Sequence, residues 1–456
     1  MMTPFPLSAA RRRAAICAGL ALCAALPAQA QTDAAPPGSA YGCSELELST
    51  ALPAIEGHDG VFFRTFTDLR MQHPLDDRMV TLMGQLAAVL RENGTTLVYV
   101  AVPAKSAGMP DDLPEHATDY GFVPAIAEAV YTDFITRLNA AGVLAPDVMT
   151  ALQANTTDQP VFFGADFHWT SQGARLGAAA IAQMIKADPA YADLPVKTFV
   201  STAIGPEVAF SGMRRSLQSY CTQSLPPTET IAYRTEEQAD PDAGAGTLDI
   251  FATGDAVLPL VLVGTSYSDS PINNFAGFLE ESSGLDIVNY AITGGNQYGG
   301  MTSYLTSDEF QAQRPRFLIW ENPIYNNLAQ YGTAPMEELI AAAGSSCTTA
   351  LEMTRVDDMT VSASLAGLNI SAQDAIFADF GAEGPRFADV TLQTASGLTR
   401  HARIERSARL RATGNFYLGM AAYAMPGFTT VTVRFDRPVS DATALTYCPK
   451  TKGDAT

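Results

Sequence analysis

The chain has 456 residues, with 28 lysines and arginines against 48 aspartates and glutamates, which gives a formal net charge of −20 at pH 7. So acidic a chain repels nucleic acid and anionic lipid, which argues against both as partners. A hydrophobic content of 47% excludes a disordered chain, and the length is enough for two or three domains.

Residues 1–30 have the pattern of an export signal. Arg11 to Arg13 precede an uncharged apolar stretch from Ala14 to Leu26, and Ala28-Gln29-Ala30 supplies a small-x-small cleavage pattern. Because the stretch is short for a bilayer span, we expect cleavage after Ala30 rather than an uncleaved anchor, and export to the periplasm. Residues 31–40 are polar and proline-rich and are expected to form a flexible lead-in.

Four of the six cysteines remain once the signal is removed. An even set suits disulfide bonds in an oxidising compartment. The positions favour Cys43 with Cys221 and Cys347 with Cys448, since each pair closes one folding unit, and free buried thiols are the alternative. Without C-x-x-C spacing, a zinc site is not expected.

Residues 41–345 alternate between apolar strand-like runs and amphipathic helical patterns. The expected strands are apolar on both faces, as in a parallel sheet covered by helices: 96–103, 257–264, 286–292 and 317–320. The expected helices lie between them: 79–92, 123–141, 170–187 and 271–282. This alternation predicts a three-layer α/β domain.

Residues 346–456 have a different character, with partial alternation of polar and apolar residues and Gly or Pro in several gaps. The pattern predicts a small antiparallel β-sandwich with strands over 352–365, 388–398, 400–412, 415–422 and 429–435. A bond between Cys347 and Cys448 would tie its first strand to its last.

Ser266 occupies a position suited to a nucleophile. An apolar strand ends at Gly264, and Pro271 is expected to begin a helix capped by Asp269 or Ser270. A serine between strand and helix has backbone N–H groups nearby to hold an oxyanion. The motif is G-T-S-Y-S rather than G-x-S-x-G, so an ordinary loop is the alternative.

His168 is the best candidate base for Ser266 among the five histidines. Asp166 lies two residues earlier, so both side chains would leave one face of an extended segment, and a carboxylate there raises the basicity of the imidazole. The alternative is that Asp166 and Thr170 are only turn and cap residues. A metal site built on Asp166 and His168 is not expected, because no second histidine lies at ligand spacing.

Three segments together resemble the alginate O-acetyltransferases of the AlgX/AlgJ family, which have SGNH-hydrolase-like domains: D-F-H-W-T-S-Q-G at 166–173, G-T-S-Y-S at 264–268 and L-I-W-E-N-P at 318–323. The order, with D-x-H before the serine, is that of this family. The resemblance implies Ser266 as nucleophile, His168 as general base and Asp166 as its orienting partner.

The same resemblance implies an oxyanion hole made by the N–H groups of Ser266 and Gly294. Asn322 and the segment 293–300 depart from the family pattern, so a further donor is left open between Asn296 and Asn322. Tyr267 and Trp169, next to Ser266 and His168, are expected to contact substrate. The cysteine-bracketed C-terminal unit resembles a carbohydrate-binding module.

Basic residues crowd into one stretch of the C-terminal unit: Arg400, His401, Arg403, Arg406, Arg409 and Arg411. If the stretch is a strand, Arg403, Arg409 and Arg411 project from one face, and arginine forks bind carboxylates in a bidentate manner. We expect a groove for an acidic polysaccharide, with a solvated face paired to nearby acids as the alternative.

The reaction expected from the resemblance is acetyl transfer to hydroxyls of an acidic exopolysaccharide through an acetyl-serine. No cofactor or nucleotide-binding loop is expected, and the acetyl group would come from a membrane-bound acyltransferase partner among other export proteins. A polysaccharide acetyl esterase and a non-catalytic binding scaffold are the competing readings.

Overall fold

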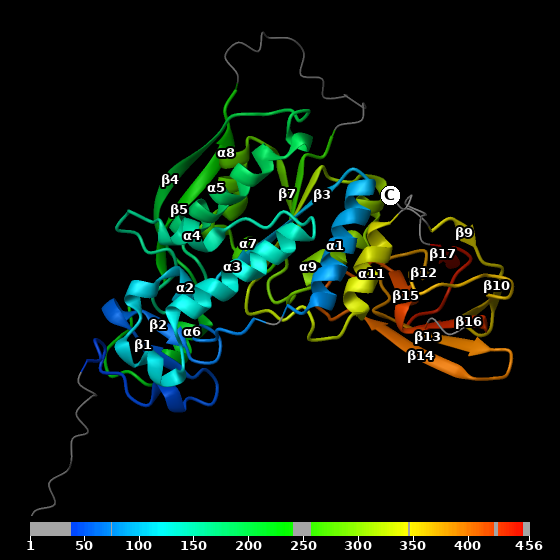
Figure 1. Ribbon diagram of the computed structural model, residues 1–456, viewed down its shortest axis with the longest axis horizontal. Coiled ribbons are helices and arrows are strands. Elements are labelled where there is room, and N and C mark those ends of the chain that lie inside the picture. Colours follow the sequence, from blue (N-terminus) through cyan, green and yellow to red (C-terminus); the bar gives the residue numbers. More distant parts are fainter. Residues whose placement is uncertain (1–37, 74, 240–256, 345–346, 424–426, 450–456) are drawn as a thin grey trace, which may run out of the picture.

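The computed structural model describes residues 38–73, 75–239, 257–344, 347–423 and 427–449 (Figure 1). The predicted export signal and most of the lead-in lie outside these residues. At the end of the predicted lead-in, Ser39 and Ala40 donate hydrogen bonds to the Glu56 carboxylate, and the flexibility of the lead-in stays a prediction. Among the described residues, no helix combines the length and apolarity needed to cross a membrane.

A four-stranded parallel sheet forms the centre of the first unit, in the order β3-β8-β6-β7. Its strands match the four predicted runs: β3 Thr96–Val102, β6 Leu260–Val263, β7 Ile287–Asn289 and β8 Phe317–Pro323. Every residue of β3 is buried, because its alternate side chains enter different cores. Leu97 and Tyr99 pack in one hydrophobic cluster, and Val98 and Val100 in the other.

Helices cover both faces of this sheet, which confirms the three-layer α/β prediction. The cluster that contains Leu97 is completed by α1 and α11, and the cluster that contains Val98 by α5 and α8. The α-helices of the unit are α1 Asp77–Glu92, α2 Lys105–Gly108, α3 Pro124–Ala140, α4 Val148–Gln153, α5 Ser171–Ala187, α6 Gly212–Gln218, α7 Ser266–Asp269, α8 Phe275–Ser283, α9 Gly299–Leu305, α10 Asp308–Ala312 and α11 Ala334–Ala343.

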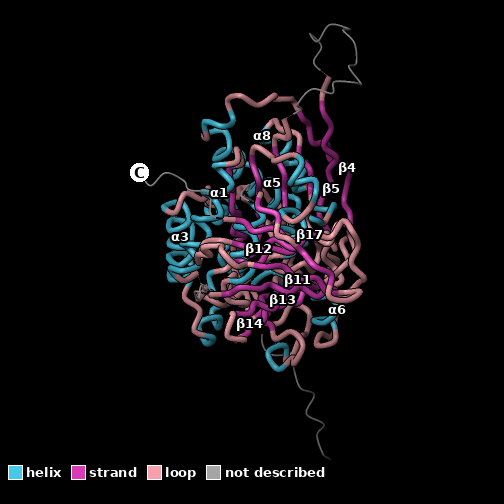
Figure 2. The backbone as a smooth tube through the Cα atoms, turned by 90° about the vertical axis from the view of Figure 1, so that its right-hand side faces the viewer, coloured by secondary structure: helices cyan, strands magenta, loops and turns pink. Residues whose placement is uncertain are grey.

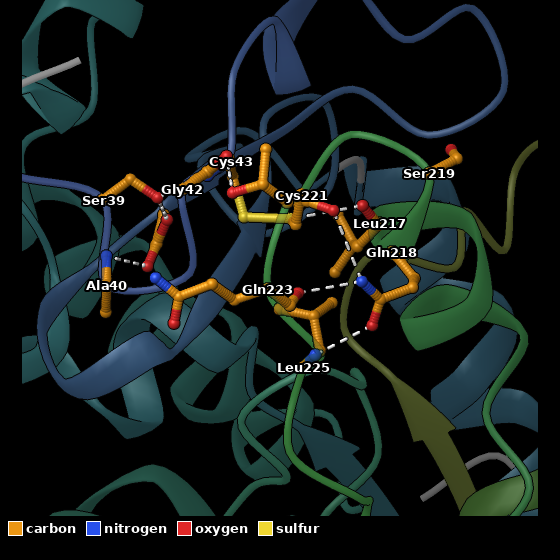
Figure 3. The surroundings of a disulfide bond; sticks show 12 residues. Ser39, Ala40, Gly42, Cys43, Leu217, Gln218, Ser219, Cys221, Gln223 and Leu225 are labelled. Carbon is orange, nitrogen blue, oxygen red and sulfur yellow. Dashed lines mark hydrogen bonds between the residues drawn. A yellow bond between two sulfur atoms is a disulfide. The ribbon is translucent and has the colours of Figure 1, made fainter. Parts of the chain in front are cut away.

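Two antiparallel ribbons flank the layers and were not predicted: β1 Ala54–Glu56 with β2 Phe62–Arg64, and β4 Phe199–Val208 with β5 Glu229–Glu237. Short 3-10 helices span Leu46–Leu48, His58–Gly60, Pro110–Asp112, Glu115–Tyr120, Pro189–Tyr191, Pro271–Asn273 and Ala421–Tyr423. The Cys43–Cys221 disulfide joins the start of the described chain to the segment after α6 (Figure 3).

The C-terminal unit is a sandwich of two antiparallel sheets, as predicted. The sheets are β10-β11-β16-β13-β14 and β15-β12-β17-β9, and one hydrophobic cluster fills the space between them. Figure 2 views this unit from the side, with β12 and β17 above β11, β13 and β14. The strands are β9 Thr349–Ala350, β10 Met353–Arg355, β11 Thr360–Ser364, β12 Ala375–Asp379, β13 Phe387–Thr394, β14 Thr399–Glu405, β15 Asn415–Gly419, β16 Phe428–Phe435 and β17 Ala444–Cys448.

The second disulfide joins Cys347 to Cys448, also as predicted. It does tie the first strand to the last, because Cys448 ends β17 and β17 pairs with β9. Three strands, β9, β12 and β17, were missed by the sequence pattern. The predicted strand 400–412 was too long, since β14 ends at Glu405 and the chain then turns towards the α/β unit.

The two units share a buried interface. α11 lies between α1 and β15 (Figure 1), and the side chain of Arg406 forms two hydrogen bonds with Glu338 of α11. Thr306 and Thr413 are also hydrogen-bonded through their hydroxyls across the interface, at 2.9 Å. The segment after β14 therefore serves as a connection between the units.

Candidate active site

Ser266 lies at the carboxyl end of β6, as the first residue of the one-turn helix α7. Thr265 caps this turn by accepting a hydrogen bond from the Tyr267 N–H. Pro271 begins a 3-10 turn with Ser270 at its N-cap position, as predicted, but the Ser270 side chain makes no capping hydrogen bond. Asp269 accepts from the Thr293 N–H instead of capping the turn. As a first helical residue, Ser266 has an N–H without an intrahelical partner.

A buried carboxylate supports the Ser266 turn from the neighbouring strand. Glu321 of β8 is fully buried and accepts hydrogen bonds from the Thr265 N–H at 2.8 Å and the Ser268 hydroxyl at 2.9 Å. Burial raises the pKa of Glu321 to about 7, although these hydrogen bonds oppose the shift. Glu321 thus connects the residues on both sides of Ser266.

His168 comes from a tight loop between Phe162 and Trp169. These two residues form an isolated antiparallel bridge, and the Phe163 N–H donates to the His168 carbonyl at 3.1 Å. Asp166 and His168 therefore do not lie on an extended segment, and that part of the prediction was wrong. Their side chains meet because the loop turns back on itself.

Asp166, His168 and Ser266 form one hydrogen-bonded row. Oδ1 of Asp166 lies 2.7 Å from Nδ1 of His168 and also accepts from the His168 N–H at 2.8 Å. Nε2 of His168 lies 2.7 Å from Oγ of Ser266, across 98 residues of chain. The arrangement leaves Nε2 able to take the proton of the serine hydroxyl.

The carboxylate of Asp166 is held at both oxygens. Oδ2 accepts a 2.6 Å hydrogen bond from the hydroxyl of Ser211, the residue that caps α6. Burial by itself would raise the pKa of Asp166, but the hydrogen bonds from His168 and Ser211 outweigh it and hold the pKa below its usual value. Asp166 is therefore the charged partner of His168 at neutral pH.

Tyr267 and Trp169 are not placed to contact substrate, so those two predictions were wrong. Trp169 is fully buried and donates from Nε1 to the Tyr267 carbonyl at 2.9 Å. Tyr267 is also buried, and its hydroxyl donates to the Phe167 carbonyl at 2.7 Å. Both side chains instead tie the His168 loop to the Ser266 turn.

The predicted oxyanion donors have different outcomes. The Ile292 N–H donates to the Gly264 carbonyl at 3.0 Å, which brings the turn containing Gly294 beside Ser266, and Gly294 stays a prediction. The prediction of Asn322 as an oxyanion donor was wrong, because its buried amide donates to the Gln297 carbonyl and its oxygen accepts from Asn326. Asn296 is exposed and stays a prediction.

The arginines do not form one binding face. Arg406 is buried against Glu338, so its predicted role in binding substrate was wrong. Arg403 is bonded to Asp389 and Glu405, and Arg411 to Glu309 and Glu383, which favours the alternative of pairing with nearby acids.

Arg409 contacts the turn that contains Thr293 and Gly294. It follows the end of β14, and its Nη1 donates to the Thr293 carbonyl at 3.4 Å. A Cβ on Gly294 would lie 3.1 Å from the same Nη1. Arg400 is the second residue of β14, and its role in binding substrate stays a prediction.

A groove of about 460 Å³ lies between the two units. Its walls combine residues of the α/β unit and of β14 and β15, among them Asn296, Tyr298, Tyr331, Arg403, Ser407 and Tyr423. Aromatic and polar side chains of this kind suit a sugar, since rings cover its apolar face and polar groups bond its hydroxyls.

Sequence reasoning missed Ser211 and Glu321. Ser211 had only the weak signal of a serine before a helix, and its partner Asp166 lies 45 residues earlier. Glu321 had a stronger signal, since a glutamate inside the apolar run F-L-I-W-E-N-P must be buried and must find partners.

A serine at the end of a parallel strand, hydrogen-bonded to a histidine that a carboxylate holds, defines an α/β protein with an SGNH-hydrolase-like arrangement. The profile of the family described as "SGNH hydrolase-like domain, acetyltransferase AlgX" matches residues 54–324. The chain belongs to this AlgX family.

Named relatives agree with this membership. The chain is 33% identical over 307 residues to the alginate biosynthesis protein AlgX of Pseudomonas aeruginosa, covering 67% of this chain and 62% of the relative. It is 31% identical over 307 residues to the probable alginate O-acetylase AlgJ of the same species, covering 63% and 75%. The solved structure of P. aeruginosa AlgX superimposes with a TM-score of 0.72 at 24% identity, covering 87% of this chain and 94% of that one, which shows the shared fold.

Proposed function

We propose that the protein is an O-acetyltransferase that places acetyl groups on hydroxyls of an acidic, alginate-like exopolysaccharide. The observation that carries the proposal is the hydrogen-bonded row of Asp166, His168 and Ser266. Family membership and the printed name of the AlgJ relative, a probable alginate O-acetylase, support acetylation as the chemistry. The export signal predicted for residues 1–30 supports work in the periplasm.

In the first step, Nε2 of His168 takes the proton of Ser266 while Oγ attacks the carbonyl carbon of an acetyl donor. The tetrahedral intermediate collapses, His168 returns the proton to the leaving group, and acetyl-serine remains. In the second step a sugar hydroxyl, deprotonated by the same histidine, attacks the acetyl-serine. His168 then gives the proton to Oγ, which restores Ser266.

Asp166 stabilises the imidazolium that forms in each step and holds Nδ1 as the donor. The N–H groups of Ser266 and Gly294 are the proposed oxyanion donors, and a donor of this kind is worth about 3–4 kcal/mol in the transition state. The acetyl group is proposed to arrive from a membrane-bound acyltransferase, with other export proteins supplying the polymer.

The polymer is proposed to lie along the groove between the two units, with the C-terminal sandwich as a carbohydrate-binding module. Arg409 beside Gly294 would bind a uronate carboxylate close to Ser266. Tyr331 and Tyr423 in the groove wall would cover sugar rings.

The test incubates the purified protein with p-nitrophenyl acetate and an oligouronate, followed by mass spectrometry of the sugar. Acetylated oligouronate supports the transferase, whereas free acetate with unmodified sugar indicates an esterase. Ser266→Ala should abolish transfer, and Ser270→Ala, in the same turn but without a hydrogen bond to His168, is the matched control. Retention of transfer in Ser266→Ala would exclude the acetyl-serine mechanism.

A further inference from the structure

Lys105 is a buried lysine directly after the central strand β3. It is the first residue of α2, and only 1% of its surface is exposed. Among the ion pairs of the described residues, none involves Lys105. A buried ammonium without a contacting carboxylate is costly, so its surroundings must compensate in another way.

Four backbone carbonyls surround the ammonium. Nζ donates to the Phe62 carbonyl at 2.9 Å, and to the carbonyls of Phe163, Gly164 and Asp166 at 2.6, 2.6 and 3.0 Å. A neutral amine has two hydrogens and an ammonium has three, so four acceptors favour the protonated form. Burial lowers the pKa of Lys105 to about 7 while Asp68, Asp166 and Asp112 raise it and Arg64 lowers it.

Three of these carbonyls belong to the loop between Phe162 and Trp169, which carries Asp166 and His168. Three carbonyl dipoles that point at one place repel one another unless a cation lies between them. The Asp166 carbonyl is bound to Nζ, while the Asp166 side chain points the other way to His168 and Ser211. The hydrogen bond from Nζ to the Asp166 carbonyl therefore fixes the orientation of this peptide group.

We propose that Lys105 is a positioning residue for the acid–base pair: its ammonium holds the loop carbonyls of Phe163, Gly164 and Asp166 so that the Asp166 carboxylate meets Nδ1 of His168. The role of Lys105 rests on the proposed function in one respect, namely that Asp166 and His168 serve acyl transfer. Lys105 does not act on substrate, because its described hydrogen bonds all go to backbone carbonyls.

The test compares the wild type with Lys105→Met, which keeps the length of the side chain and removes the charge. Two measurements are made: the rate of Ser266 labelling by a fluorophosphonate between pH 6 and 9, and the kcat and KM of acetyl transfer. We expect labelling to slow by about 10- to 100-fold, part of what a general base contributes. We also expect kcat to fall with KM unchanged, because the acid–base pair is misplaced while the groups that bind substrate are not.

Asn139→Ala is the matched control. Asn139 also holds a loop through its side chain, by hydrogen bonds to the Ile135 carbonyl and to both backbone groups of Ala145. Its loss lowers stability without touching the 163–168 loop, so the labelling rate and kcat should not change. Lys105→Gln, which can still donate two hydrogen bonds, should give an intermediate labelling rate.

Labelling of Ser266 within twofold of wild type in Lys105→Met would overturn the proposal. So would unfolding of both Lys105 variants, since a role confined to the loop predicts folded proteins. Failure of the proposed function is a separate outcome: wild-type Ser266 then labels but transfers no acetyl group to sugar. The labelling rate reports on Lys105 in either case.

Discussion

Ser211 donates its hydroxyl hydrogen to Oδ2 of Asp166 at 2.6 Å, the carboxylate oxygen that His168 does not use. Ser211 caps α6, and the segment after α6 is held by the disulfide between Cys221 and Cys43 (Figure 3). The carboxylate that orients His168 is therefore fixed from two sides, by its own loop and by α6.

Replacing Ser211 with alanine tests this second support. Ser211→Ala leaves Oδ2 without its donor, so the pKa of Asp166 should rise towards its usual value. We expect kcat for acetyl transfer to fall by about 3- to 10-fold, which corresponds to the net worth of one ordinary hydrogen bond. Ser216→Ala on the same helix is the control, since Ser216 donates only to the Gly212 carbonyl. Equal rates for the two variants would contradict the role of Ser211.

The buried carboxyl of Glu321 predicts a pH dependence of stability. Its pKa is about 7 in the folded protein against 4.5 as the usual value, so the folded state binds the proton more tightly than the unfolded state. The stability from this group is complete below about pH 4.5 and is lost as the pH rises through 7, a change of roughly 3 kcal/mol. Glu321→Gln removes the titration and should unfold at higher urea than wild type at pH 8, with a smaller advantage at pH 5.

The control for this measurement is Glu236→Gln, at an exposed position of β5. It should shift the urea midpoint equally at both pH values. If the difference between wild type and Glu321→Gln is the same at pH 5 and pH 8, Glu321 is ionised throughout and the prediction is wrong.

The ion pair of Arg406 and Glu338 should stabilise the contact between the units. Arg406→Met leaves the carboxylate of Glu338 buried without its cation, which costs about 3–5 kcal/mol in comparable pairs. The double variant with Glu338→Gln should recover part of this loss. Arg403→Met is the control, because its ion pairs are exposed to solvent and should contribute little to stability. Denaturant midpoints measure each effect, and similar losses for both arginines would contradict the assignment.

Binding of polyuronate should depend more on Arg409 than on Arg403. Arg409 lies beside Gly294, whereas Arg403 already shares its guanidinium with Asp389 and Glu405. We expect Arg409→Ala to weaken binding of oligouronates by about 3- to 10-fold at low salt, as the loss of a charge-assisted contact. The double change with Arg403→Ala should weaken binding further and leave the fold intact. Calorimetric titration at low salt provides the measurement, and unchanged affinity would remove Arg409 from the proposed polymer-binding residues.

The sequence by itself determined the parallel sheet, the two disulfides and the candidates for the triad. Local composition was enough for the sheet, because a strand buried on both faces must be almost entirely apolar, as T-L-V-Y-V-A-V is. Ser266 could be recognised because it follows such a strand, and His168 because an aspartate lies two residues before it.

Only the tertiary structure decided what holds these residues and which neighbours bind substrate. Lys105 and Ser211 reach Asp166 across 61 and 45 residues of chain, and no local pattern encodes a partner at that distance. Arg406 was predicted to bind substrate as part of a basic stretch, but the strand ends one residue before it, and its guanidinium pairs with Glu338, 68 residues away. Side-chain pattern predicts which residues are buried, whereas the pairing of buried polar groups depends on how distant segments pack.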